Sequence, residues 1–161
     1  MLFKLLEAHQ IPYQRVDHRP VYTCDEARQF VPPIEGAETK NLFLRDEKGR
    51  RHFLISMPAD KNVNLKALGA ILEVKGLSFA SAERLKRYLG IEPGSVTLLA
   101  VVNDVEQKVE VVVDAALWRE ERILCHPLVN TSTVSLRRED LELVLGILHH
   151  SPRLVSVPSS E

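Results

Sequence analysis

The fold is decided by residues 39–57, TKNLFLRDEKGRRHFLISM. Two apolar segments, Lys40–Arg45 and Arg51–Met57, have the composition of β-strands. The segment between them, Asp46–Gly49, is polar and ends in glycine, as tight turns do. The stretch therefore predicts a β-hairpin, and we expect this hairpin to lie at the centre of a sheet.

Outward from the hairpin, helix and strand signals follow one another in mixed order. The predicted helices begin near Leu2, Thr23, Asn64 and Ser81 and after Ser135, and the further predicted strands cover residues 13–16, 96–102, 109–113 and the surroundings of Val134. This order predicts a single α/β domain in which helices flank a mixed, largely antiparallel sheet. We expect residues 1–150 to form that domain and residues 151–161 to form a loose C-terminal tail.

The amino-acid composition limits which kinds of partner the protein is expected to bind. With 45% apolar and 27% charged residues, the chain resembles ordinary globular proteins and has no apolar run near the about 20 residues of a membrane span. The N-terminus becomes charged too early for a secretory signal, so we expect a cytoplasmic protein without membrane contact. The net charge of -1 argues against DNA binding and leaves only local contacts for RNA. Basic residues that could form such a contact, or simply solvate the surface, are Lys48, Arg50, Arg51, His52, Arg84, Lys86 and Arg87.

Signals for disulfides, metals and nucleotide cofactors are missing from the sequence. Cys24 and Cys125 are too few for a disulfide framework and lack zinc-binding spacing. The histidines form no HExxH pattern, and no glycine-rich phosphate loop occurs. We therefore expect neither a metal nor a nucleotide cofactor.

Three segments contain residues that could take part in catalysis or substrate binding, and each also has a simpler structural interpretation. Lys40 begins an apolar strand, so its cation could face a cleft or could lie exposed at the strand end. Gly94 and Ser95 follow a proline, so their backbone amides could point together at an anionic oxygen or could form an ordinary turn. His126 could line a pocket or be a partly buried histidine with its hydrogen bonds satisfied. A nucleophilic pair with Cys125 is not expected, because neighbours in an extended chain project to opposite sides.

Taken together, these motifs resemble one known family. The chain is similar to the YbaK/ProX family in the ordered motifs KNLFL at 40–44, GLSF at 76–79, GSVT at 94–97, VVND at 101–104 and HPLVNT at 126–131. Members of this family resemble the editing domain of bacterial prolyl-tRNA synthetases, and the free-standing forms hydrolyse amino acids wrongly attached to tRNA. Within the family the chain looks most like the ProXp-ala branch, which removes alanine from proline tRNA. The resemblance implies a trans-editing aminoacyl-tRNA deacylase.

The resemblance also implies roles for individual residues. Lys40 is expected to place the 3′ end of the tRNA, and Gly94 and Ser95 are expected to lie in the loop that faces the scissile ester. In this mechanism backbone amides near Gly94 bind the oxyanion, and a ribose hydroxyl of the tRNA helps to activate water. The expected substrate-binding residues are Asn41, Ser78, His126, Asn130 and Thr131.

The sequence leaves two alternative functions open, a different amino-acid substrate and a non-catalytic binding role. The family loop often has proline where Leu98 follows GSVT, which puts the amino-acid preference in question. A deacylase for seryl-, threonyl- or cysteinyl-tRNA could use the hydroxyls of Ser56, Ser78 or Thr131. A non-catalytic module of the same fold could instead bind tRNA or a synthetase. The acceptor 3′ end of tRNA, that of proline tRNA first, is the expected partner, with a prolyl-tRNA synthetase or an elongation factor as a further one.

Overall fold

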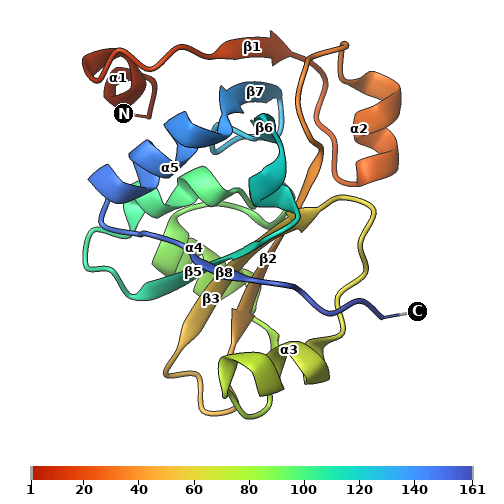
Figure 1. Ribbon diagram of the computed structural model, residues 1–161, viewed down its shortest axis with the longest axis vertical. Helices are drawn as coiled ribbons and strands as arrows, with labels where there is room; N and C mark the ends of the chain where they lie inside the picture. The colour runs from red at the N-terminus through yellow and green to blue at the C-terminus, as the bar shows by residue number, and fades with distance from the viewer. Residues whose placement is uncertain (1, 161) are drawn as a thin grey trace.

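The computed structural model describes residues 2–160, and its strands form two sheets (Figure 1). The strands are β1 (Gln14–Asp17), β2 (Thr39–Arg45), β3 (His52–Pro58), β4 (Ser78–Phe79), β5 (Val109–Asp114), β6 (Arg122–Cys125), β7 (Ser132–Arg137) and β8 (Arg153–Val155). The larger sheet has the order β4-β2-β3-β5-β8, and the smaller sheet has the order β1-β7-β6.

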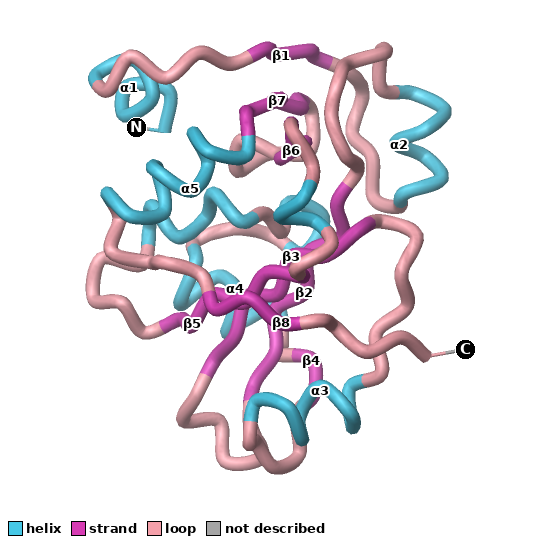
Figure 2. Tube along the Cα trace, viewed as in Figure 1, coloured by secondary structure: helices cyan, strands magenta, loops and turns pink. Residues whose placement is uncertain are grey.

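Helices cover both sheets. The α-helices are α1 (Leu2–Ala8), α2 (Cys24–Phe30), α3 (Leu65–Leu72), α4 (Ala82–Leu89) and α5 (Arg138–Ile147), and the 3₁₀ helices are η1 (Pro93–Ser95), η2 (Leu98–Asn103) and η3 (Leu117–Arg119). Figure 2 shows the smaller sheet with α1 and α5 at one end of the molecule and α3 at the other. Within residues 2–160, no helix combines the length and the apolar character that a membrane crossing requires.

The predicted hairpin is present and central. β2 pairs with β3 in antiparallel register from Thr39–Pro58 to Arg45–His52, and β3 lies between β2 and β5. Nearly every residue of β3 is buried, which explains why this strand is a continuous apolar run and does not alternate. The hairpin prediction is confirmed.

The pairing type also agrees with the prediction of a mixed, largely antiparallel arrangement. β5 pairs in parallel with β3 and β8, whereas the β2–β3, β2–β4, β1–β7 and β6–β7 pairs are antiparallel. The prediction of a loose tail after Ser151 is wrong, because β8 adds an edge strand to the larger sheet. Val157, just beyond β8, is buried in the core. A three-residue strand carries too little periodicity to be found in the sequence.

The predicted core strand over residues 96–102 is also wrong. This segment forms η2 after the short helix η1, and Leu98 to Val102 are all buried. The Thr97 side chain accepts a hydrogen bond from the Leu99 amide at 3.3 Å and thereby caps η2. β-Branched residues favour strands only where a strand partner is present, and here tertiary packing selects a tight helix.

The helix starts follow their predicted caps. Thr23, Asn64 and Ser81 each accept a hydrogen bond from the backbone amide three residues on, at 3.0–3.2 Å. Gly90 ends α4 with φ at +67°, a left-handed conformation that glycine adopts without a steric penalty. Local side-chain chemistry therefore sets these boundaries.

The larger sheet is buried on both faces. One cluster of buried side chains joins this sheet to the smaller sheet, α4, α5 and η2, and it includes Phe43, Leu54 and Val134. A second cluster lies under α3 on the opposite face and includes Leu44, Met57 and Leu68. Successive residues of β2 thus face different layers, which decides where its polar residues point.

Candidate functional site

A cavity of about 290 Å³ lies where α2 meets the start of β2 and the end of β6. This volume is close to the lower limit for small-ligand pockets. The lining side chains are mostly apolar, and they belong to Cys24, Ala27, Arg28, Val31, Pro32, Pro33, Ile34, Glu38, Thr39, Ala59, Leu124, Cys125, His126 and Thr133.

One histidine lines this cavity, and a second histidine contacts one of its lining residues. His126 lines it, and burial holds the pKa of this imidazole below its ordinary value. The His126 Nδ1 atom faces the Ser132 carbonyl at 3.2 Å, so Nδ1–H donates and Nε2 keeps a free lone pair. His18 holds another lining residue, because its Nε2 lies 2.9 Å from the Thr133 hydroxyl. The cavity therefore offers a neutral imidazole and an oriented hydroxyl.

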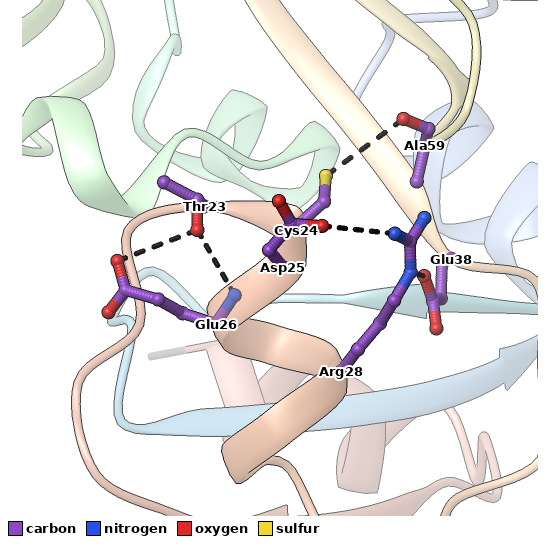
Figure 3. Close-up of polar contacts among 7 residues, drawn as sticks. All are labelled: Thr23, Cys24, Asp25, Glu26, Arg28, Glu38 and Ala59. Carbon is purple, nitrogen blue, oxygen red and sulfur yellow. Dashed lines mark hydrogen bonds and ion pairs between the residues drawn. The ribbon is translucent and has the colours of Figure 1, made fainter.

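Helix α2 forms one wall of the cavity, and Figure 3 shows how polar contacts hold it. Arg28 bonds Asp25 at 3.2 Å within the helix and Glu38 at 3.3 Å ahead of β2. The Cys24 thiol points at the Ala59 carbonyl at 4.0 Å (Figure 3). These contacts tie the helix to the open end of the β2–β3 hairpin, where β2 begins and β3 ends.

Lys40 lies in a second, more open groove that shares Cys24, Arg28 and Ala59 with the cavity. The groove is lined by Tyr22, Thr23, Cys24, Asp25, Arg28, Lys40, Ala59, Asp60 and Asn62. The Lys40 ammonium donates to the Lys61 carbonyl at 2.9 Å and lies 3.5 Å from Asn62 Oδ1. Lys40 therefore faces the groove, whereas Thr39 on the opposite face of β2 lines the cavity.

The loop that holds Lys40 is itself anchored by a buried ion pair. The Lys61 ammonium bonds the carboxylate of Asp114, whose side chain is 1% exposed, and also the Val157 carbonyl at 3.0 Å. The Ser160 amide donates to the Asn62 carbonyl at 2.7 Å. The C-terminal segment thus supports the site, a role that the expectation of a loose tail missed.

Gly94 and Asn130 meet at one place, beside Tyr22. The Asn130 side chain donates to the Val21 carbonyl at 3.1 Å, and the Val21 amide donates to the Asn130 carbonyl at 3.4 Å. A Cβ atom on Gly94 would lie 2.7 Å from Tyr22 Cδ1 and 3.2 Å from Asn130 Nδ2. Glycine is therefore required there for close approach of the Tyr22 ring, which lines the Lys40 groove.

Ser95 does not fit its expected role. Its amide donates to the Glu92 carbonyl at 2.9 Å, so that amide is not free to bind an oxyanion in this conformation. The residue as a whole is 8% exposed. The 3₁₀ turn of η1 therefore uses the backbone amide that was expected to point at an anionic oxygen of the substrate.

Two other expected substrate contacts lie away from the cavity and the groove. Ser78 is exposed and pairs with Arg45 at the opposite end of β2 from Lys40, about 17 Å away at about 3.3 Å per residue. Thr131 is exposed, and its carbonyl accepts from the His18 amide at 2.9 Å. Thr133, two residues further on, lines the cavity instead.

Asn41 lies on the same face of β2 as Thr39, one residue pair further along the strand. Its side-chain amide donates to the Thr39 hydroxyl at 3.4 Å, and that hydroxyl donates to the Leu124 carbonyl at 2.9 Å. Among residues 2–160, Asn41 Oδ1 is buried without a hydrogen-bond partner. Asn41 therefore supports a cavity-lining residue and does not line the cavity itself.

The basic residues of the hairpin turn and α4 are largely engaged in structure. Arg51 forms a bidentate pair with Glu110 at 2.8 and 2.9 Å. Arg84 donates to the Gly49 carbonyl at 3.2 Å and lies 3.0 Å from Nε2 of the buried His52. The part of the chain described here contains no group of three acidic, histidine or cysteine side chains arranged to hold a metal ion.

Comparison with known proteins gives a consistent result. A model of the aminoacyl-tRNA editing domain matches residues 18–143, and the boundary expected at residue 150 stays a prediction. The chain is 40% identical to the prolyl-tRNA editing protein ProX of Acetoanaerobium sticklandii over 142 residues, 87% of this chain and 85% of that protein. It is 34% identical to prolyl-tRNA synthetase associated domain-containing protein 1 of Danio rerio over 88% of this chain and 77% of that one.

The fold has also been seen before. A crystal structure described as a candidate trans-editing enzyme for prolyl tRNA synthetase superposes with a TM-score of 0.70 at 16% identity, covering 96% of this chain and 92% of that one. At that identity the match shows the fold alone. The domain match and the sequence relatives show that the chain belongs to the YbaK/ProX family of aminoacyl-tRNA editing domains, whose reaction is the deacylation of mischarged tRNA.

Proposed function

We propose that this protein removes alanine from mischarged proline tRNA, acting in trans. The observation that carries the proposal is the small, mostly apolar cavity of about 290 Å³ beside a groove that holds Lys40. The cavity would take the amino-acid side chain, and the groove would take the terminal nucleotide. The shared residues Cys24, Arg28 and Ala59 would then lie next to the ester.

A separate editing site of this kind meets a physical need. A synthetase pocket built for proline cannot strongly exclude a smaller apolar amino acid, because a missing methylene is worth only about 1–3 kcal/mol. A second site that admits only the small product supplies the missing discrimination. The relative named prolyl-tRNA editing protein supports proline tRNA as the carrier.

The proposed chemistry is direct hydrolysis by water. An aminoacyl ester is already activated, so oriented donors can contribute a large part of the rate, about 10²–10³-fold for one donor. Lys40 would place the terminal nucleotide, and the backbone at Gly94 would face the ester. His126, neutral because burial lowers its pKa, offers the Nε2 lone pair to the substrate ammonium or to water.

A covalent route through Cys125 is not part of this proposal. Burial raises the pKa of its thiol to about 12, so almost none of it is thiolate at neutral pH. Its neighbour His126 directs Nδ1 at a backbone carbonyl.

Serine is the second candidate substrate, and a specific observation favours it. The hydroxyls of Thr39 and Thr133 line the cavity, and either could hydrogen-bond a substrate hydroxyl. The same reaction and the same Lys40 role would apply. A non-catalytic module that binds charged tRNA or a synthetase remains the alternative of another class.

The partners that follow from the proposal are the acceptor 3′ end of proline tRNA, in the cytoplasm, and a prolyl-tRNA synthetase or an elongation factor that delivers it. The deciding experiment charges one proline tRNA with alanine, serine or proline and follows release of each amino acid. We expect release of alanine alone, lost in Lys40→Ala and retained in Lys48→Ala, an exposed lysine in the hairpin turn. Release of serine alone would overturn the alanine assignment, and stoichiometric binding without release would establish the binding module.

A further inference from the structure

Tyr22 is an exposed aromatic residue at the edge of the Lys40 groove. Its exposed fraction is 69%, against 60% for Phe79. Large aromatic side chains gain stability by burial, and an exposed ring beside a polar groove is typical of binding surfaces. The folded chain alone gives no reason for this exposure.

The backbone on both sides of Tyr22 is fixed. Val21 is 2% exposed, and Asn130 bonds both its amide and its carbonyl. On the other side, the Thr23 side chain caps α2 through the Glu26 amide at 3.1 Å. A ring between a buried residue and a helix cap loses little freedom when a ligand binds, which favours affinity.

The ring itself is supported by Gly94. A Cβ atom at residue 94 would lie 2.7 Å from Tyr22 Cδ1 and 2.9 Å from Cε1, closer than real Cβ contacts come. Tyr22 thus lies directly against the backbone of η1 and still exposes most of its surface. The arrangement holds a flat, supported ring at the groove edge.

We propose that Tyr22 stacks on the 3′-terminal nucleobase of the tRNA. This inference rests on the proposed function and deepens it. The scissile ester is attached to the terminal ribose, so the base on that ribose must lie within a few bonds of the ester. Two basic side chains line the groove: Arg28 is paired with carboxylates, whereas the Lys40 ammonium contacts only a backbone carbonyl and an amide oxygen. The Lys40 cation beside one aromatic ring matches a phosphate followed by an unpaired base, because proteins bind single-stranded ends by charge and stacking.

Stacking predicts which variants lose substrate affinity. Removing an aromatic platform raises KM by about tenfold or more, whereas kcat is kept when the reacting groups are unchanged. We expect this result for Tyr22→Ala and Tyr22→Leu, and we expect a wild-type KM for Tyr22→Phe, which keeps the ring. Phe79→Ala is the matched control, because Phe79 is similarly exposed but lies on β4 at the far end of β2.

A second substrate separates stacking from a structural effect. The alanyl ester of adenosine carries the base, and alanine methyl ester does not. Wild-type protein should prefer the adenosine ester, and Tyr22→Ala should lose that preference while hydrolysing the methyl ester at the wild-type rate. A KM for alanyl-tRNA that is unchanged in Tyr22→Ala, or an unchanged preference between the esters, would overturn the inference and leave the proposed function intact. A wild-type protein inactive on every charged tRNA would overturn the proposed function itself.

Discussion

The substitution Gly94→Ala tests how the η1 turn contributes to the site. The new methyl carbon would lie 2.7 Å from Tyr22 Cδ1, whereas carbon atoms in contact are separated by about 3.5–4.0 Å. The φ angle at residue 94 is not in the left-handed region, so the backbone itself accepts alanine. The strain must therefore be relieved by movement of the Tyr22 ring, by roughly 1 Å.

The cost in stability should be small and the cost in binding larger. Overpacking costs about 1–3 kcal/mol in a closed core, and we expect about 1 kcal/mol here because the ring is 69% exposed and can swing outward. In a protein of this size that loss lowers Tm by about 2–4 °C. Displacement of the stacking ring should raise KM for alanyl-tRNA by about tenfold, as Tyr22→Ala does. Alanine keeps the backbone amide, so kcat should stay near the wild-type value.

A double-mutant cycle of Gly94→Ala and Tyr22→Ala tests whether Gly94 acts through Tyr22. Deacylation kinetics give KM and kcat of each variant, and thermal melts give its stability. If Gly94 acts by placing Tyr22, then Gly94→Ala has no further effect on KM in a Tyr22→Ala background. A loss of kcat of the same size in both backgrounds would refute this reasoning, because it would mean that the added methyl group disturbs the reacting groups and does not act through Tyr22.

Three further predictions concern stability and cysteine chemistry. Asp114→Asn leaves the 21% exposed Lys61 side chain without its counterion, so thermal melts should show a loss of about 2 kcal/mol; an unchanged Tm would contradict this. Burial lowers the pKa of His52 and of His126 below the ordinary 6.5, so both are neutral in the fold. As the pH falls, these two histidines take up protons in the unfolded chain before they do so in the folded chain. The free energy of unfolding should therefore fall as pH drops below 6.5, with a smaller fall in His126→Gln. Cys125→Ala should keep deacylation within the same order of magnitude, and the wild-type thiol should resist iodoacetamide at pH 7.5.

Local side-chain chemistry explains which parts of the fold could be predicted. The Thr23, Asn64 and Ser81 caps set helix starts through bonds within one turn, so the sequence alone is sufficient. The hairpin was predictable because both strands and the turn lie within one short stretch of consecutive residues, 39–58. β8 and η2 were missed because long-range packing decides them, in the first case against β5 and in the second inside the main core.

The candidate site shows the same limit. The family motifs led to Lys40, Gly94, His126 and Asn130, which the fold places around one cavity and its neighbouring groove or beside Tyr22. Tyr22 was missed because a tyrosine before a helix cap carries no signal until its exposure is known.

Other contacts depended on strand register and sheet edges. Thr133 was missed in favour of Thr131, because Thr131 lies in the turn before β7, whereas Thr133 lies within β7 and lines the cavity. The Lys61–Asp114 pair joins residues 53 positions apart, beyond any local pattern.

In the proposed function, rejection of proline cannot depend on apolar contact. Alanine and proline differ by two methylenes, worth about 0.8 kcal/mol each, and an apolar cavity would hold the larger residue more tightly. Proline must therefore be rejected by steric overlap, which works only where the wall cannot yield. The cavity wall contains Val31, Pro32 and Pro33, whose β-branched side chain and fixed φ angles leave little freedom. The Arg28–Glu38 pair further ties α2, which precedes this segment, to the start of β2. Rigidity of this wall, more than its volume, would make the cavity a sieve.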